Sequence, residues 1–221
     1  MNIKHHLDEA TLVSYAAGAI SQSMALVVAS HISLCPSCRQ RVAQAESIGG
    51  LLLDQMQQAE IRSDAMEQAL AALDGVMPES VSAREPISTV RREPGLPAPL
   101  FEQLGCNLDQ VNWKRLVPGV YYHDLPCKSE RGGVSRLMRI APGKGMLPHT
   151  HDGNELTLVL QGSFCDEVGR FSAGDVADLD SEIEHQPLVD SDEDCICLIA
   201  TDAPLKFSTL LGRVVQPFTG F

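Results

Sequence analysis

The sequence predicts an α + β protein of two domains, a small all-α helical domain followed by an all-β domain of the jelly-roll kind. Three observations support this fold class. Residues 1–77 have the apolar spacing of helices, whereas short alternating segments separated by Gly and Asp turns follow residue 100. Between them, residues 78–99 contain five prolines, which prevent regular structure. We therefore expect a helical domain at residues 1–77, a linker at 78–99 and a β domain at 100–221.

The composition restricts the class of function. The net charge of −12 weighs against direct binding to nucleic acid, which needs a basic surface. The polar N-terminus is no secretory signal, and the sequence contains no apolar run long enough to span a membrane. Seven cysteines without a signal peptide favour a reducing compartment. A cytoplasmic protein is the expectation.

Four helices are expected in the first domain, over residues 9–17, 24–34, about 40–53 and about 63–76. Asp8 is a suitable N-cap for the first of them and Gly18 a suitable stop. A break is expected in the third helix near Gly49 and Gly50. The fourth has an apolar stripe, which is either core or a docking surface for another protein, formed by Ala65, Met66, Ala69, Leu70 and Leu73.

Strands are expected in the second domain at residues 134–140, 156–160 and 194–200. The first of these alternates apolar and polar residues, and the other two are short apolar runs bounded by turn residues. The apolar end of the chain, residues 207–221, is expected to return and pack on the β domain.

The residues around Cys35 have the make-up of a structural zinc site. Cys35 and Cys38 form a Cys-x2-Cys pair, and His31 lies one helical turn before Cys35. Either His6 or its neighbour His5 could supply the fourth ligand. A thioredoxin-like redox pair is the main alternative, but it expects a sheet around the motif, whereas this segment is helical on both sides. A pair of buried thiols is the other alternative.

A second metal site is predicted in the β domain. Residues 143–162 fit the pattern Gly-x5-His-x-His-x3-Glu-x6-Gly, which resembles the first motif of the cupin family. Gly174 and His185 keep the spacing of that family's second motif, although the Pro, Gly and Asn of the motif are missing. The resemblance implies a site of three histidines and one carboxylate, formed by His149, His151, Glu155 and His185. The alternative is a set of surface or hydrogen-bonded histidines, and the ligand types alone do not select the metal.

Cys195 and Cys197 lie on the last predicted strand and face the same side. Residues i and i+2 of a strand lie about 6.5 to 7 Å apart, so an internal disulfide would need distortion. They are either buried core cysteines or an oxidation sensor near a metal.

The combination of the two halves resembles the zinc-binding anti-sigma factors of the ChrR type. The resemblance covers nearly the whole chain and is carried by the His-x3-Cys-x2-Cys set, the cupin-like motif, residues 3–6 (Ile-Lys-His-His), residues 15–18 (Tyr-Ala-Ala-Gly) and residues 194–205. It implies that the helical domain inhibits an extracytoplasmic-function sigma factor, with zinc on His6, His31, Cys35 and Cys38. It also implies that the cupin-like domain carries a second zinc and receives a singlet-oxygen or related oxidative signal, with Cys195 and Cys197 matching a cysteine pair of that type.

Two functions are therefore weighed from the sequence. The first is a non-enzymatic anti-sigma factor of an oxidative stress response. The second is a metal-dependent cupin dioxygenase with an accessory zinc domain. The second leaves the helical His-x3-Cys-x2-Cys set and the Pro-rich tether without a purpose, so the regulator is preferred.

Overall fold

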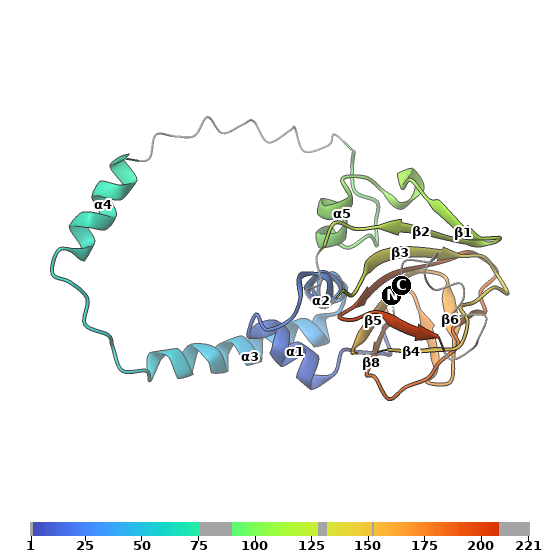
Figure 1. Ribbon diagram of the computed structural model, residues 1–221, viewed down its shortest axis with the longest axis horizontal. Coiled ribbons are helices and arrows are strands. Elements are labelled where there is room, and N and C mark those ends of the chain that lie inside the picture. The colour runs from blue at the N-terminus through green and yellow to red at the C-terminus, as the bar shows by residue number, and fades with distance from the viewer. Residues whose placement is uncertain (1, 76–89, 128–131, 152, 208–221) are drawn as a thin grey trace.

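The computed structural model describes residues 2–75, 90–127, 132–151 and 153–207 of the chain (Figure 1). Its first part, residues 2–75, is helical and is called the helical part below. The helices of this part are α1 (Glu9–Ala16), α2 (Gln22–Leu34), α3 (Pro36–Asp54) and α4 (Ala65–Gly75). The part from residue 98 to residue 207 is called the β part. This order of helices followed by sheets confirms the predicted fold class.

Short polar side chains fix where the first two helices begin. The carboxylate of Asp8 accepts a hydrogen bond from the Thr11 N–H (2.6 Å), and the Ser21 hydroxyl accepts one from the Met24 N–H (3.4 Å). Each satisfies a backbone donor that the first turn of a helix leaves unpaired. Gly18 follows α1 with φ +66°, a conformation that suits glycine and ends the helix. The predicted cap and stop of α1 are confirmed.

The predicted break in the third helix is wrong. Helix α3 starts at Pro36 and continues through Gly49 and Gly50 to Asp54. Glycine lowers helix stability by about 1 kcal/mol relative to alanine, but it ends a helix only where the backbone turns left-handed. Neither glycine has a positive φ, and the residues on both sides favour helix, so the helix continues.

The β part begins with α5 (Ala98–Leu104) and a short 3-10 helix, η1 (Leu108–Gln110). Antiparallel strands follow, and they form sheets in the orders β1-β2-β3-β10-β5-β8, β7-β6-β9 and β11-β4. The strands of the large sheet are β1 (Lys114–Val117), β2 (Val120–Asp124), β3 (Ser135–Ile140), β10 (Cys195–Thr201), β5 (Glu155–Gln161) and β8 (Val176–Leu179). The smaller sheets contain β4 (His149–His151), β6 (Ser163–Cys165), β7 (Arg170–Ser172), β9 (Leu188–Val189) and β11 (Leu205–Phe207). The three predicted strands correspond to β3, β5 and β10. Of the predicted return of residues 207–221, only Phe207 lies within the described residues.

The central strands β3, β10 and β5 of the six-stranded sheet are buried on both faces. Side chains alternate along each strand, so neighbours such as Cys197 and Leu198 on β10 point to opposite faces. Cys197 belongs to an inner cluster with Met138 and Val159, between the sheets. Leu198 belongs to an outer cluster. Because both of its faces are buried, β10 is apolar along most of its length and does not alternate apolar and polar residues.

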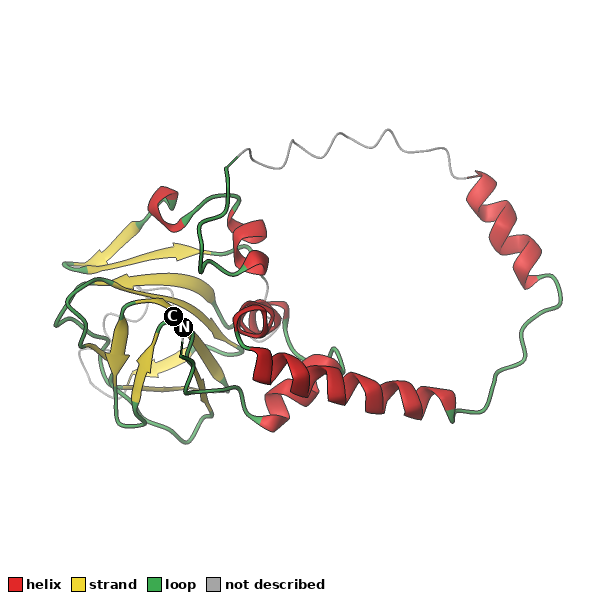
Figure 2. Ribbon diagram, turned by 180° about the vertical axis from the view of Figure 1, so that it is seen from behind, coloured by secondary structure: helices red, strands yellow, loops and turns green. Residues whose placement is uncertain are grey.

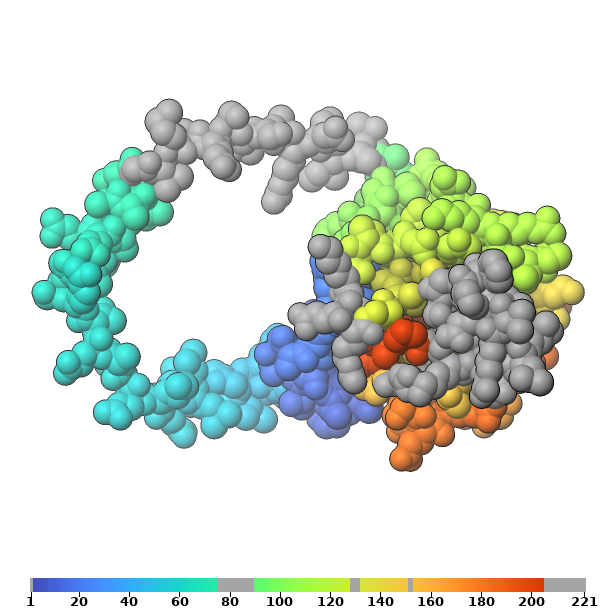
Figure 3. Space-filling model, viewed as in Figure 1, coloured from blue at the N-terminus to red at the C-terminus, as the bar shows by residue number. Residues whose placement is uncertain are grey.

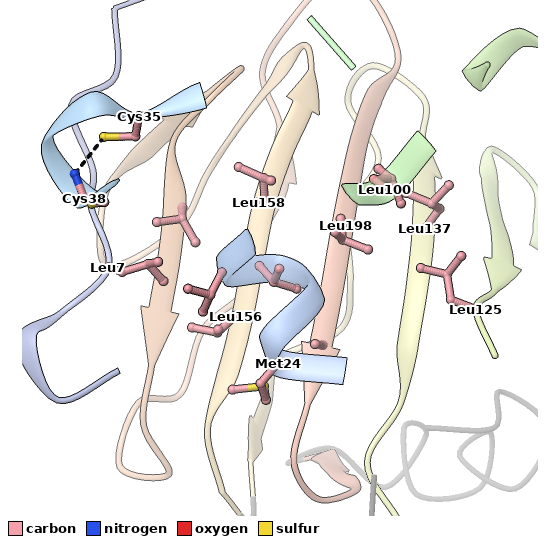
Figure 4. Close-up of a cluster of buried hydrophobic side chains, with 14 of the residues drawn as sticks. Leu7, Met24, Cys35, Cys38, Leu100, Leu125, Leu137, Leu156, Leu158 and Leu198 are labelled. Atoms are coloured by element: carbon pink, nitrogen blue, oxygen red, sulfur yellow. Dashed lines mark hydrogen bonds between the residues drawn. The ribbon is translucent and has the colours of Figure 1, made fainter. Parts of the chain in front are cut away.

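The helical part supplies the cover of the outer face. Helix α2 lies across β5 and β10, where Leu158 and Leu198 point toward it (Figure 4). Val27 and Val28 of α2 are fully buried in the same cluster. Figure 2 shows α1, α2, α3 and α5 on one side of the sheets, with α4 standing apart. The helical part and the β part therefore share one hydrophobic core, while the division of the chain at residues 77 and 100 stays a prediction.

Helix α4 and the end of α3 stand clear of this core (Figures 1 and 3). The large apolar side chains of these two elements and of the segment between them are between 54% and 82% exposed. We call this set the apolar arm; it comprises Ile48, Leu51, Leu52, Leu53, Met56, Ile61, Met66, Leu70 and Leu73. Among the described residues, no helix combines the length and the apolar character that crossing a membrane requires.

Candidate metal centres

The helical part brings four metal-binding side chains together at the point where three of its segments meet. His6 comes from the segment before α1, His31 from the last turn of α2, Cys35 from the junction of α2 and α3, and Cys38 from the first turn of α3. One ligand atom from each lies within 4.8 Å of all the others. We call this set the helical cluster. Two thiolates and two imidazoles are a donor set that structural zinc prefers.

Local structure places the two sulfurs. Cys35 precedes α3, with Pro36 as the first residue of the helix, and the Cys38 N–H donates to the Cys35 Sγ (3.5 Å; Figure 4). A helix N-terminus favours negative charge and therefore suits thiolates. His6 Nδ1 lies 3.3 Å from the Cys35 Sγ and 3.5 Å from the Cys38 Sγ. These three ligand atoms already converge on one point.

The histidine of α2 offers an independent test of whether a metal fits. His31 Nδ1 lies 3.1 Å from the Gly174 carbonyl oxygen, to which it donates. The other ring nitrogen, Nε2, is then an acceptor, and it is buried without a hydrogen-bond partner among the described residues. A buried unpaired nitrogen is costly. Since Nε2 is the atom that the helical cluster would use, a metal ion would satisfy it.

The electrostatics of the helical cluster are consistent with this use. Burial, reinforced by the neighbouring His6, lowers the pKa of His31 to about 4, so its imidazole is neutral and able to bind a metal. Burial raises the pKa of Cys38 to about 11 in the metal-free protein. Metal binding must therefore displace a proton from this thiol, as it does at structural zinc sites.

His5, the other predicted candidate for the N-terminal ligand, lies outside the helical cluster. Its ring packs on Phe171 of β7, with the ring centroids 4.4 Å apart. Between the two adjacent histidines, the geometry therefore selects His6.

A second set of donors lies between the sheets of the β part. His149 on β4, Glu155 on β5 and His185 before β9 place one ligand atom each within 4.8 Å of one another. The Nε2 atoms of the two histidines are 3.1 Å apart, and the His185 Nε2 is 4.0 Å from a Glu155 carboxylate oxygen. We call these three residues the cupin cluster. His151 is also on β4, but its side chain lies outside the described residues.

Outer hydrogen bonds orient the ligands of the cupin cluster. His149 Nδ1 donates to the Leu147 carbonyl oxygen (2.8 Å), and His185 Nδ1 donates to the Asp166 carboxylate (2.9 Å). Burial by itself lowers the pKa of His185, but Asp166 and Glu155 raise it above its ordinary value. Such carboxylate–histidine pairs are typical of metal sites. The sequence did not predict Asp166, because it lies outside both motifs and 19 residues from His185.

The predicted cysteine pair faces the same interior. Cys195 and Cys197 are buried, and their sulfurs are 3.5 Å apart as free thiols. They line a cavity of about 40 Å³ together with His149, Glu155 and His185. The hydrogen bond with Cys195 and burial raise the pKa of Cys197 well above its ordinary value. The Cys197 thiol is therefore protonated at neutral pH, and the redox role of the pair stays a prediction.

Comparisons with known proteins agree with this architecture. Residues 102–204 match the family described as the ChrR cupin-like domain. The chain is 42% identical over 218 residues to the anti-sigma-E factor ChrR of Cereibacter sphaeroides strain ATCC 17023, covering 99% of each protein. It is also similar to a chain in the crystal structure of Rhodobacter sphaeroides SigE in complex with the anti-sigma factor ChrR. That match has a TM-score of 0.75 and 39% identity, and it covers 91% of this chain and 100% of that one.

Proposed function

Because the chain belongs to the family of ChrR anti-sigma factors, we propose that it binds an extracytoplasmic-function sigma factor and holds it inactive. The relative that matches over nearly the whole length is an anti-sigma factor, and the similar solved structure is a complex with a sigma factor. The feature of this chain that best supports the proposal is the exposed apolar arm.

The apolar arm has the character of a protein-binding surface. Met66, Leu70 and Leu73 recur at the i, i+4 and i+7 positions of α4 and so share one face of the helix, yet all three are exposed. Their exposure among the described residues favours the docking interpretation of this stripe over the core interpretation. Contiguous exposed apolar side chains commonly mark an interaction site, and an amphipathic helix of this kind fits an apolar groove of a partner.

We further propose that zinc occupies the helical cluster, and that a second metal, also zinc, occupies the cupin cluster with His151. At the helical cluster the metal would tie the segment before α1 to the ends of α2 and α3. Structural zinc contributes directly to folding, so this tie would hold the base of the apolar arm in its binding shape.

Metal removal tests the proposal. We expect the full-length protein to contain two zinc ions per chain and to form a one-to-one complex with its sigma factor. Chelation of the zinc should weaken sigma binding about 100-fold or more, because structural zinc sites are worth many kcal/mol of folding free energy. Elemental analysis and calorimetric titration measure the two quantities. Unchanged binding by protein shown to be zinc-free would contradict the zinc part, and failure of the zinc-loaded protein to bind would contradict the anti-sigma function.

The β part is proposed to receive an oxidative signal, singlet oxygen or a related oxidant. Oxidation of Cys195 and Cys197 would join their sulfurs, with two protons and two electrons reducing singlet oxygen to hydrogen peroxide. Since a disulfide between i and i+2 strains a strand, β10 would distort. The next residue, Leu198, packs against α2, so the distortion would reach the helical part.

Substitution of the pair tests this route. In the full-length complex, light and a photosensitiser should release the sigma factor, and Cys195→Ser with Cys197→Ser should slow the release about 10-fold or more. Cys165→Ser is the matched control, since Cys165 is a half-buried free cysteine of the same part. Equal release rates for the double variant and the wild type would exclude these thiols.

An enzymatic function is not proposed. The cavity beside the cupin cluster has a volume of about 40 Å³, which accommodates two or three water molecules. An organic substrate needs a much larger pocket.

A further inference from the structure

The turn between β7 and β8 contacts the helical cluster from the side of the β part. Gly174 in this turn accepts the His31 Nδ1 hydrogen bond through its carbonyl oxygen (3.1 Å). The next residue, Asp175, has a buried carboxylate, only 1% exposed. One of its oxygens accepts the backbone N–H groups of Lys4 (2.6 Å) and His5 (3.0 Å). The other accepts the Ser172 N–H (2.9 Å), which closes the turn.

These contacts hold the segment that carries His6. The Val176 N–H donates to the His5 carbonyl oxygen (3.4 Å), and the Asp8 N–H donates to the Asp178 carboxylate (3.1 Å). His6 therefore lies between His5 and Asp8, which are each bonded to β8. The chain before α1 runs beside β8, and its contact with the helices includes Leu7, which is buried and whose carbonyl oxygen accepts a hydrogen bond from Arg41 of α3 (3.1 Å).

The ligands of the helical cluster thus have two different supports. Cys35 and Cys38 are positioned by the junction of α2 and α3. The β7–β8 turn adds a support to both imidazoles: Gly174 is bonded to the ring of His31, and Asp175 is bonded to the backbone directly before His6. Groups that orient metal ligands from outside commonly change metal affinity 10- to 100-fold when they are removed.

We propose that Asp175 is a positioning residue of the helical zinc centre, through which the β part sets the zinc affinity of the helical part. The inference rests on the proposed occupancy of the helical cluster by zinc. A carboxylate suits this position because its hydrogen-bond partners among the described residues are the N–H groups of Lys4, His5 and Ser172, which approach both oxygens. An asparagine has the same shape, but its NH2 group would face one of these donors.

The test uses the full-length protein and the variant Asp175→Asn. Cobalt(II) is the spectroscopic probe, and both proteins also carry Cys195→Ser and Cys197→Ser, because these two cysteines line the cavity beside the cupin cluster. In this background thiolate-to-cobalt absorption reports the helical cluster. Displacement of cobalt by zinc, in competition with a chelator, then measures zinc affinity at the helical cluster alone. We expect the variant to bind zinc about 10- to 100-fold more weakly and to show an altered cobalt spectrum.

Asp190→Asn is the matched control. The Asp190 carboxylate also accepts hydrogen bonds within the β part, from Ser163 and Arg170, but it does not contact the segment before α1 in these bonds. We expect wild-type zinc affinity in this variant. If Asp175→Asn does not fold, as judged by circular dichroism, Asp178→Asn loosens the same segment at Asp8 and should weaken zinc binding severalfold.

The outcomes separate this inference from the proposed function. Zinc binding by Asp175→Asn within twofold of the wild type, with an unchanged cobalt spectrum, would overturn the positioning role and leave the zinc centre intact. Absence of thiolate-to-cobalt absorption in the wild type would overturn the zinc centre itself, and the inference with it.

Discussion

Replacing His6 with alanine should remove zinc from the helical cluster and weaken sigma binding about 100-fold or more. His6 Nδ1 lies within 3.5 Å of the Cys35 and Cys38 sulfurs. Its loss reduces the number of ligands at the helical cluster from four to three. A structural zinc site is closed, and it loses much of its affinity with any ligand. Zinc content by elemental analysis and sigma binding by calorimetry measure the effect.

His5→Ala is the control for this prediction. His5 is adjacent in sequence and identical in chemistry, but its ring packs on Phe171 outside the helical cluster. The substitution leaves the backbone N–H of residue 5 in place, so its hydrogen bond to the Asp175 carboxylate is kept. We expect His5→Ala to keep its zinc and its sigma affinity. Loss of zinc in His5→Ala with retention in His6→Ala would reverse the assignment of the ligand.

Replacing Leu70 with glutamate should weaken sigma binding about 30-fold or more and leave folding intact. Leu70 is 54% exposed on the apolar face of α4, so a charge there costs little stability in the free protein. In a complex it would be buried against an apolar groove, where a central substitution commonly costs about 2 kcal/mol or more. Thermal unfolding and calorimetric titration measure the two effects separately.

Ala71→Glu provides the matched control, because it adds the same charge on the adjacent, non-apolar face of the same helix. We expect sigma binding within about threefold of the wild type. Equal weakening by both substitutions would indicate a general effect of charge, and no weakening by Leu70→Glu would place the sigma contact elsewhere than on this face of α4.

The features predicted from sequence are those encoded by local spacing. Asp8 three residues before Thr11 specifies a cap, and Cys-x2-Cys at the start of a helix places two sulfurs together. The spacing of His149 and Glu155 indicates a cupin-like strand pair in the same way. These relations involve residues a few positions apart, so they can be read without the tertiary structure.

The remaining features depend on contacts between distant residues. His31 and Gly174 are 143 positions apart, and Lys4 and Asp175 are 171 positions apart. No periodicity relates such pairs, which meet only because α2 packs on the outer face of the sheet. The choice between His5 and His6 depends on the same packing, since the backbone of His5 is bonded to β8 and its ring is turned to Phe171.

The core shared by α2 and the large sheet limits how such proteins can be rebuilt by recombination. Val27 and Val28 pack in one buried cluster with Leu158 and Leu198. In a chimera that joins this helical part to the sheet of a distant relative, the side chains at this contact would not be complementary. Gain of a new sensor by exchange of whole domains would then require matching substitutions on both sides. Under the proposed sensing role of the β part, a change of signal would then arise more readily from substitutions around the cupin cluster than from exchange of the whole β part.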